Sequence, residues 1–317
     1  MKIVAAHNKD NFIRVNSSSG GVFSILAEQI LNKGGVVYGA AFDENWGVEH
    51  IRITDSKDLD KLRRSKYVFS KFAFSVKNVE EDLKQNRKVL FSGVPCQVAA
   101  VRKKIGNNTN LLCVEVICHG APQAYYWYKY LGELCSLLGE NNKNISSINF
   151  RDKRTGWKGY SFTIKFNDGK EFSQKASSNA YMRAFLSNYT LRKVCFGCQF
   201  KYPNGSLADI TLGDFWGIEK VASNLNNNLG TTIVIVRSDQ GEIAAKRIDI
   251  DSIIDFSAVR KYNRAICVPP TMPVDYEKFQ YEAKLAEYLT PVINEFIKTP
   301  KNGKLKKLIK KCIRLFK

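Results

Sequence analysis

The chain has 317 residues and a formal net charge of +19, with 44% apolar and 25% charged residues. This length and apolar content allow a large buried core, which excludes a disordered chain or a small domain that depends on disulfides. The positive charge favours anionic partners such as nucleic acid, anionic lipid or phosphorylated ligands. The sequence carries no zinc-finger spacing, RNP signature or helix-turn-helix pattern, so we expect no nucleic-acid partner.

The N-terminus and the cysteine content indicate the compartment. The segment MKIVAAHNKD lacks the apolar stretch of a signal peptide. No apolar run approaches the ~20 residues of a membrane-spanning helix. We therefore expect a cytoplasmic protein, in which eight cysteines indicate metal or redox chemistry before disulfides.

Helix and strand patterns alternate in the first half of the chain. Gly20 and Gly21 open the first clear helical pattern, and Pro95 suits the first turn of a second helix. The predicted helices are 20–31, 95–104 and 122–138. The predicted strands are 36–42, 50–54, 88–91 and 111–118.

The second half is richer in strands, with helices after Pro270. Asn167, Asp168 and Gly169 read as the turn of a hairpin. Strands are predicted at 148–150, 160–166, 170–172, 210–212 and 231–236, and a helix at 178–187. The pattern predicts a mixed α/β fold with a central mixed sheet flanked by helices and a C-terminal helical extension. We divide the chain into a main domain (1–250), that extension (251–300) and a basic tail (301–317).

The sharpest local motif is Cys195-Phe196-Gly197-Cys198. Two intervening residues let both sulfur atoms face one metal centre across a tight turn. The pair has three interpretations: half of a zinc site, half of an iron–sulfur cluster site, or a thioredoxin-type redox pair. The last is the weakest, because the motif lies between basic residues and a polar loop and not at a helix start.

Cys96 and Cys118 follow predicted strands. Cys96 comes directly after Pro95, so it lies near a helix N-terminus, where the helix dipole favours a thiolate. Cys118 ends the strand of the segment LLCVEVIC. Strand ends on one side of an α/β sheet gather around the site, so these two cysteines and the CxxC pair form a candidate set of four thiolates.

Other cysteines and histidines carry a weaker signal. His119, next to Cys118, is interpreted as a hydrogen-bond donor to a cluster sulfur or as a structural imidazole. Buried cysteines are more often small core residues than ligands. We apply that interpretation to Cys113, Cys135, Cys267 and Cys312.

Two glycine-containing segments suggest a cofactor site. Ser17 to Gly21 precedes a helix and resembles an anion cradle, although Ser and Gly are also common helix caps. The segment GDFWG contains Asp214 and two aromatic residues, which would stack on a flavin ring or pack in the core.

Taken together, the chain resembles the family of coenzyme F420 hydrogenase/dehydrogenase β-subunits. The resemblance extends roughly from Arg14 to Val236, with its segments in the family's order. The segments are SSSGGVFS, LRRSKYVFS, VLFSGVPCQVAAVR, CHGAP, INFRDKRTGWKGYSF, LRKVCFGC and ADITLGDFWG.

The resemblance implies an oxidoreductase with a flavin, usually FAD and otherwise FMN, beside a 4Fe–4S cluster. The cluster-type cysteines of the family fall on Cys96, Cys118, Cys195 and Cys198. Its glycine-rich segment falls on Ser19, Gly20 and Gly21, and we add Asp214 to the flavin-site prediction. No catalytic residue is assigned.

The departures from the family also carry expectations. Many relatives begin with a ferredoxin-like domain, whereas this chain has no cysteine before Cys96. Electrons would then come from a separate ferredoxin-like carrier. At position 123 this chain has Gln where relatives often have a small residue, and residues 202–208 lack an arginine that relatives often have. The resemblance therefore does not identify the small-molecule substrate. Some relatives accompany enzymes of surface-polysaccharide assembly, which suggests that setting.

A second hypothesis belongs to another functional class. Four cysteines also satisfy zinc. The chain would then be a non-catalytic accessory protein of polysaccharide assembly with a structural zinc site.

The C-terminal tail has a basic amphipathic pattern. Residues 301–317 contain eight Lys or Arg and no acidic residue. One predicted helical face is apolar, and it consists of Leu305, Leu308, Ile309, Cys312, Ile313 and Phe316. The pattern indicates either a helix docked on the protein's own core or reversible binding to an anionic membrane surface.

Overall fold

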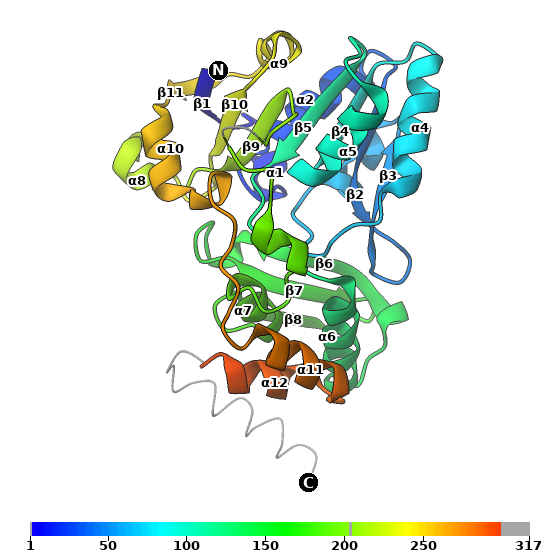
Figure 1. The fold of residues 1–317 in the computed structure, drawn as a ribbon, viewed down its shortest axis with the longest axis vertical. Coiled ribbons are helices and arrows are strands. Elements are labelled where there is room, and N and C mark those ends of the chain that lie inside the picture. Colours follow the sequence, from blue (N-terminus) through cyan, green and yellow to red (C-terminus); the bar gives the residue numbers. More distant parts are fainter. Residues whose placement is uncertain (1, 203–204, 299–317) are drawn as a thin grey trace.

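A computed structural model describes residues 2–202 and 205–298 of the chain (Figure 1). The basic tail therefore lies outside the described residues. Within the described ranges, every helix is too short or too polar to cross a membrane.

One large mixed sheet forms the upper part of the molecule in Figure 1. Its eight strands follow the order β11-β1-β10-β9-β5-β4-β2-β3. They are β1 (Lys2–Ala6), β2 (Val36–Phe42), β3 (Val48–Ile53), β4 (Val89–Gly93), β5 (Leu111–Val116), β9 (Ile210–Asp214), β10 (Thr232–Val236) and β11 (Ile250–Ile253). Strands β2, β4, β5 and β9 are parallel to one another. Strand β1 also shares their direction, because β10 is antiparallel to both β1 and β9.

Helices cover both faces of this sheet, which explains why its central strands are continuous apolar runs. One face packs on α2 (Val22–Leu31), α3 (Leu59–Leu62) and α9 (Asp239–Ala245). The other face packs on α4 (Ala73–Lys84) and α5 (Pro95–Ile105) at one end and on α8 (Ile218–Val221) and α10 (Phe256–Tyr262) at the other. A short helix, α1 (Asn11–Val15), follows β1.

A second, smaller core lies below the large sheet in Figure 1. Its antiparallel sheet consists of β6 (Ile145–Asp152), β7 (Ser161–Phe166) and β8 (Glu171–Lys175). The helices packed around it are α6 (Ala124–Leu137), α7 (Ala180–Leu186), α11 (Tyr276–Leu285) and α12 (Leu289–Phe296). The sheet, α6 and α7 belong to the connection between β5 and β9, so the second core is largely an insertion between two adjacent parallel strands.

Short 3-10 helices complete the described elements. They are η1 (Ser56–Asp58), η2 (Asn142–Asn144), η3 (Lys153–Thr155), η4 (Lys193–Gly197), η5 (Ser223–Leu225) and η6 (Arg264–Ile266).

The predicted mixed α/β class is confirmed, with a large mixed sheet flanked by helices. The predicted strands and helices are present with shifts of a few residues at their ends. Two strands and six helices were not predicted from the sequence: β1, β11, α1, α3, α4, α8, α9 and α10. Helix α4 was missed because part of its contact is polar: buried Asp82 accepts two hydrogen bonds from Arg52 at 2.8 Å each and one from the Tyr38 hydroxyl at 2.6 Å. The division of the chain at residues 250 and 300 stays a prediction.

Candidate functional site

The five like-directed strands end along one edge of the large sheet. This edge holds Ala6 of β1, Phe42 of β2, Gly93 of β4, Val116 of β5 and Asp214 of β9. Helices α2 and α5 begin at the same edge, because each runs back along the sheet beside parallel strands. In open α/β sheets, ligands bind outside the carboxyl ends of the strands. The predicted site residues lie on this edge or on the segments beside it.

The sheet register aligns Cys96 with Cys118. Gly93 of β4 pairs with Glu115 of the parallel neighbour β5. Each cysteine follows its paired residue by three positions, so the two chains leave the sheet side by side. Cys96 is the second residue of α5, after Pro95.

The CxxC pair lies against the segment that follows Cys118. Pro122 and Leu191 form an antiparallel bridge, and the Arg192 amide donates to the Ala121 carbonyl at 3.0 Å. The Ala121 amide in turn donates to Cys195 Sγ at 3.5 Å. Helix η4 and Cys198 directly after it therefore face the carboxyl ends of β4 and β5.

The four thiols lie within electrostatic reach of one another. The pKa of Cys118 is raised to about 12, mainly by burial and to a smaller extent by negative charge on Cys96, Cys195 and Cys198. The pKa of Cys96 is also raised, first by burial and then by Cys195 and Cys198. Nearby cations oppose these effects: Lys201 acts on Cys118 and Arg192 on Cys96. The raised pKa values favour the neutral thiols of Cys96 and Cys118 in the absence of a metal, and a coordinated metal ion would deprotonate them.

The donor set fits an iron–sulfur cluster by its chemistry. Four thiolates are the usual ligands of a 4Fe–4S cluster and of some structural zinc sites. Among the described residues, no three His, Cys, Asp or Glu side chains are grouped closely enough to hold one metal ion. A cluster binds each cysteine through a different iron, so its sulfur ligands stand farther apart than those around a single ion.

Ser19, Gly20 and Gly21 form the loop before α2. Gly21 is the N-cap of α2 with φ of +81°, and no side chain in the described part of the chain caps this helix end. Gly20 is required by the fold itself, since a Cβ there would lie 2.8 Å from the Ala6 carbonyl and 2.9 Å from the Thr232 amide. Ser19 Oγ donates to the Thr231 carbonyl at 2.8 Å. The Ser19 hydroxyl is therefore used by the protein, whereas the uncapped first turn of α2 offers amide donors to an anion.

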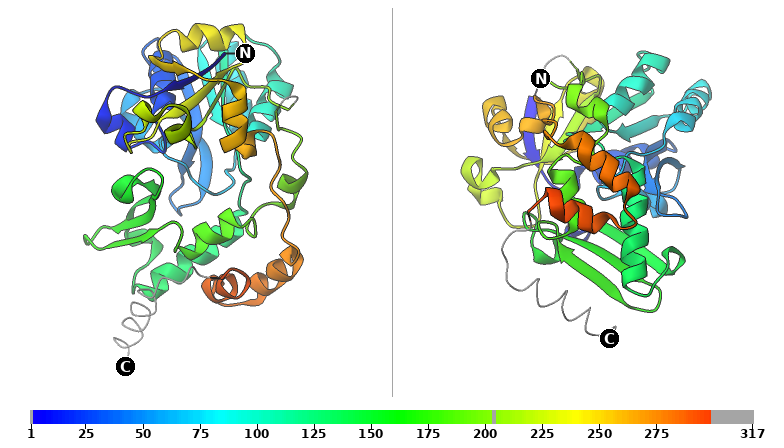
Figure 2. Two further views of the ribbon diagram at one scale, coloured as in Figure 1. Left: turned by 90° about the vertical axis from the view of Figure 1, so that its left-hand side faces the viewer. Right: turned by 60° about the horizontal axis from the view of Figure 1, so that its bottom comes forward.

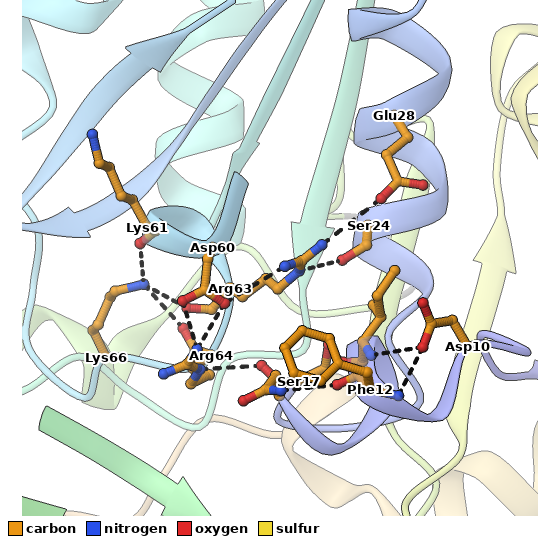
Figure 3. Close-up of polar contacts among 12 residues, drawn as sticks. Asp10, Phe12, Ser17, Ser24, Glu28, Asp60, Lys61, Arg63, Arg64 and Lys66 are labelled. Atoms are coloured by element: carbon orange, nitrogen blue, oxygen red, sulfur yellow. Dashed lines mark hydrogen bonds and ion pairs between the residues drawn. The ribbon is translucent and has the colours of Figure 1, made fainter. Parts of the chain in front are cut away.

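The basic segment from Arg63 to Lys66 lies beside the first turn of α2 and the segment before it (Figure 3). Arg63 Nε donates to Ser24 Oγ in the first turn of α2 at 3.0 Å, and Arg64 Nε donates to the Asn16 carbonyl at 3.1 Å. Lys66 Nζ donates to the Arg63 carbonyl at 2.7 Å, and burial lowers its pKa to about 7. Arg63 and Arg64 both pair with Asp60, and Arg63 also pairs with Glu28 of α2 at 3.7 Å. Cations beside an uncapped helix N-terminus favour a phosphate-containing ligand.

Asp214 connects the two cores. Its Oδ2 accepts from Arg151 Nη1 at 2.8 Å, where Arg151 belongs to β6 of the small sheet. Arg151 is only 4% exposed, and its guanidinium lies 4.1 Å from the Tyr160 ring centre and donates to the Tyr67 hydroxyl at 3.1 Å. Arg151 Nε has no hydrogen-bond partner among the described residues. An unsatisfied buried donor at this edge indicates a place where a ligand acceptor would fit.

Lys153 fixes the serine–glycine loop to the small sheet. Its Nζ donates to the carbonyls of Arg14, Ser19 and Leu229 at 2.7, 2.8 and 2.6 Å. Three acceptors match the three donors of an ammonium group. One side chain thus sets the position of the loop relative to β6 and η3.

Aromatic contacts connect Tyr67 to His119 through Phe185. The Tyr67 and Phe185 rings stack with centres 4.6 Å apart, and the His119 ring lies 5.4 Å from Phe185. Tyr67 contacts Arg151, and His119 adjoins Cys118 in sequence. The two candidate cofactor regions are therefore joined by a continuous line of packed side chains.

Sequence reasoning assigned no role to Arg151, Lys153, Tyr67 or Lys201. The first three lie inside segments that carry the family resemblance, which is the signal that would have singled them out. Lys201, directly after the CxxC loop, donates to the Cys118 carbonyl at 2.6 Å. Their roles depend on contacts across long sequence separations, which no local motif contains.

A buried network supports the helix turn that carries Cys96. His50 Nε2 donates to the Ser92 carbonyl at 2.9 Å, and His50 Nδ1 accepts from the Ser70 hydroxyl at 2.9 Å. Gln97 Nε2 donates to Ser70 Oγ at 2.8 Å, while Gln97 Oε1 accepts from the Val94 amide at 3.0 Å. The carbonyl of Ser92 only accepts, so the neutral Nε2–H tautomer suits this site.

Two sequence profiles of one family match the chain. The profile for the N-terminal part of the coenzyme F420 hydrogenase/dehydrogenase beta subunit matches residues 3–77. The profile for the C-terminal part of the same proteins matches residues 86–261. Together they cover most of the large sheet and the inserted second core.

Individual relatives agree with this match. The chain is 30% identical over 127 residues to the F subunit of F(420)H(2) dehydrogenase from Methanosarcina mazei, which covers 37% of this chain. The matched region spans only 35% of that curated relative. A chain of the F420-reducing NiFe hydrogenase complex from Methanosarcina barkeri has a TM-score of 0.54 and 15% identity, covering 90% of this chain and 93% of that one. This structural similarity establishes a shared fold.

The first prediction concerns His50. Burial, reinforced by Lys66, lowers the pKa of His50 from 6.5 to about 4. Between these values the unfolded chain binds a proton that the folded chain does not, so the free energy of unfolding falls as the pH drops from 6.5. The loss from this group reaches roughly 3 kcal/mol at pH 4. His50→Gln keeps a donor and an acceptor but does not titrate, and it should show a shallower decline in urea titrations between pH 6.5 and 4. Parallel pH profiles for the two proteins would contradict the prediction.

Proposed function

Because the chain belongs to the family of coenzyme F420 hydrogenase/dehydrogenase β-subunits, which are electron-transfer oxidoreductases, we propose that it carries a 4Fe–4S cluster and a flavin. In this proposal the cysteines Cys96, Cys118, Cys195 and Cys198 hold the cluster. The first turn of α2, with Ser19, Gly20, Gly21 and Asp214 nearby, holds the flavin. The protein then relays electrons between a separate carrier and a substrate.

One observation carries the proposal. Four thiols from three separate segments gather at the same sheet edge at which the uncapped helix α2 begins. Structural cysteines in a core have no reason to cluster in this way. The arrangement supports two cofactors side by side, separated by the packed rings of Tyr67, Phe185 and His119.

The residues around the flavin region suit the parts of such a cofactor. When bound, a flavin supplies the conversion between single electrons and a hydride. The α2 amides and Arg63 would bind its phosphate groups. Arg151, held by Asp214 and Tyr67, would orient its polar ring edge through the free Nε–H.

The partners remain proposals that rest on the resemblance. They are a ferredoxin-like electron carrier and a small-molecule substrate, with surface-polysaccharide assembly as the setting. Screening lipid-linked and nucleotide-linked sugars for reoxidation of the reduced protein would test that setting, and no reoxidation by any of them would leave it without support.

The second prediction tests the cluster against the zinc alternative. Anaerobically purified protein should contain about four irons per chain. Cys195→Ser and Cys198→Ser should each abolish bound iron. The matched control is Cys135→Ser, since Cys135 is a buried residue of α6 in the second core. Zinc without iron in the wild-type protein would favour the accessory-protein hypothesis, and full iron in both loop variants would refute the ligand assignment.

The third prediction tests the flavin region. Gly21→Ala places a Cβ 3.2 Å from Asn8 Cβ and 3.3 Å from Ser17 Oγ, at a positive φ. The loop must then shift, and flavin affinity should fall roughly tenfold while iron content is unchanged. Gly34→Ala is the matched control, because Gly34 also has positive φ but its added Cβ meets no atom within 4 Å. Absorbance titration with FAD and FMN measures the effect. Binding of neither flavin by the wild-type protein, or equal losses in both variants, would count against the site.

The fourth prediction concerns the tail, which we propose binds anionic membranes reversibly. Each basic residue near anionic lipid contributes about 1 kcal/mol, and an apolar helix face adds to this. Full-length protein should sediment with phosphatidylglycerol-containing vesicles at low salt, whereas a form that ends at Pro300 should remain in the supernatant. Equal sedimentation of the two forms would show that the tail does not bind lipid.

A further inference from the structure

A basic groove lies beside the cysteine region on α10 and η6. Its volume is about 550 Å³. The residues that line this basic groove are Phe256, Ser257, Arg260, Lys261, Arg264, Cys267 and Val268. The segment between η6 and α11 runs beside η4 in Figure 1 and in the left view of Figure 2. Contacts agree with this course, since Asn188 donates to the Thr271 carbonyl at 2.9 Å and Lys193 pairs with Glu277 at 2.5 Å.

The cations of the basic groove are available to a partner. Arg260, Lys261 and Arg264 are exposed, and none of them forms an ion pair or a side-chain hydrogen bond with any other described residue. None of the described residues that line the groove is acidic. Phe256 and Val268 provide an apolar floor, with Val268 44% exposed. An apolar centre with a polar, charged rim is the usual composition of a protein-binding surface.

The basic groove is connected to Cys118 by direct contacts. Lys201 Nζ donates to the Cys118 carbonyl and to the Ala265 carbonyl of η6, each at 2.6 Å. The next residue, Tyr202, donates its amide to the Ile266 carbonyl at 2.8 Å, and its ring packs at a tilt against Phe256 with ring centres 4.4 Å apart. The Lys201–Tyr202 segment therefore links the groove to a proposed cluster ligand.

We infer that the basic groove is the docking surface for the electron carrier, and that this carrier is a small acidic protein. The inference rests on the proposed function, because it assigns a partner to the same four cysteines. Transient redox complexes have small interfaces, and complementary charge steers their encounter. Three unpaired cations beside the cysteines provide that steering, and a protein partner would cover the apolar floor.

A charge-reversal pair tests the docking surface. Arg260→Glu/Arg264→Glu reverses two groove charges. The control, Lys33→Glu/Lys103→Glu, makes the same change in net charge at two exposed lysines. Lys33 follows the end of α2 and Lys103 lies in the last turn of α5, at the sheet edge opposite the cysteines. Neither lysine forms an ion pair with a described residue.

The probe is a small acidic ferredoxin with two 4Fe–4S clusters, and calorimetry at two salt concentrations measures binding. Wild-type affinity should fall as salt increases. The groove variant should bind roughly tenfold more weakly or worse, mainly through a slower association rate, and the control should stay within about twofold of wild type. Carbodiimide should cross-link Lys261 to carboxylates of the ferredoxin.

Other results would overturn the inference. Equal losses in the groove variant and the control would assign binding to overall charge, and unchanged affinity in the groove variant would exclude this surface. Absence of wild-type binding, or binding that salt does not weaken, would also overturn it. The iron content of the same samples separates this inference from the proposed function. Iron-free protein that still binds through the groove would refute only the cluster. Iron-loaded protein that does not bind through the groove would refute only the docking surface.

Discussion

The common direction of β1, β2, β4, β5 and β9 is the constraint on which the rest of the structure depends. Parallel neighbours release their chains at one edge, so residues far apart in sequence emerge next to each other. The register of β4 and β5 alone aligns Cys96 with Cys118. If one of these strands ran in the opposite direction, its cysteine would lie at the far edge of the sheet.

The second core supplies the remaining residues of the candidate site. It is inserted between β5 and β9, and its return segment brings Cys195 and Cys198 back over the strand ends. Arg151 and Lys153 then tie the small sheet to the large one through Asp214 and the loop before α2. A buried ion pair is costly to desolvate and seldom adds net stability. Its value here is positional, since it fixes β6 of the small sheet against β9 of the large one.

The large positive charge has a local distribution that composition does not reveal. Some cations are internal supports, such as Lys66 and Lys153 with their backbone carbonyl partners. Others, such as Arg260 and Arg264 of the basic groove, stand in solvent beside the cysteine region. The same residue types thus stabilise a loop in one place and create a surface potential in another.

The sequence by itself determined the mixed α/β class, most of the strands, about half of the helices, and the four cysteines as a candidate set. These features depend on local periodicity, on proline and glycine at element ends, and on the two-residue spacing of Cys195 and Cys198. Helix α4 was not predicted because its buried residue Asp82 makes polar contacts with Arg52 and Tyr38. A search for apolar periodicity does not detect a buried contact of this kind. Only the tertiary structure decided which strands run side by side. The order of strands follows from packing between segments that are distant in the sequence, which no local pattern contains. This strand order brings Arg151 to Asp214 and places Lys201 between Cys118 and the groove.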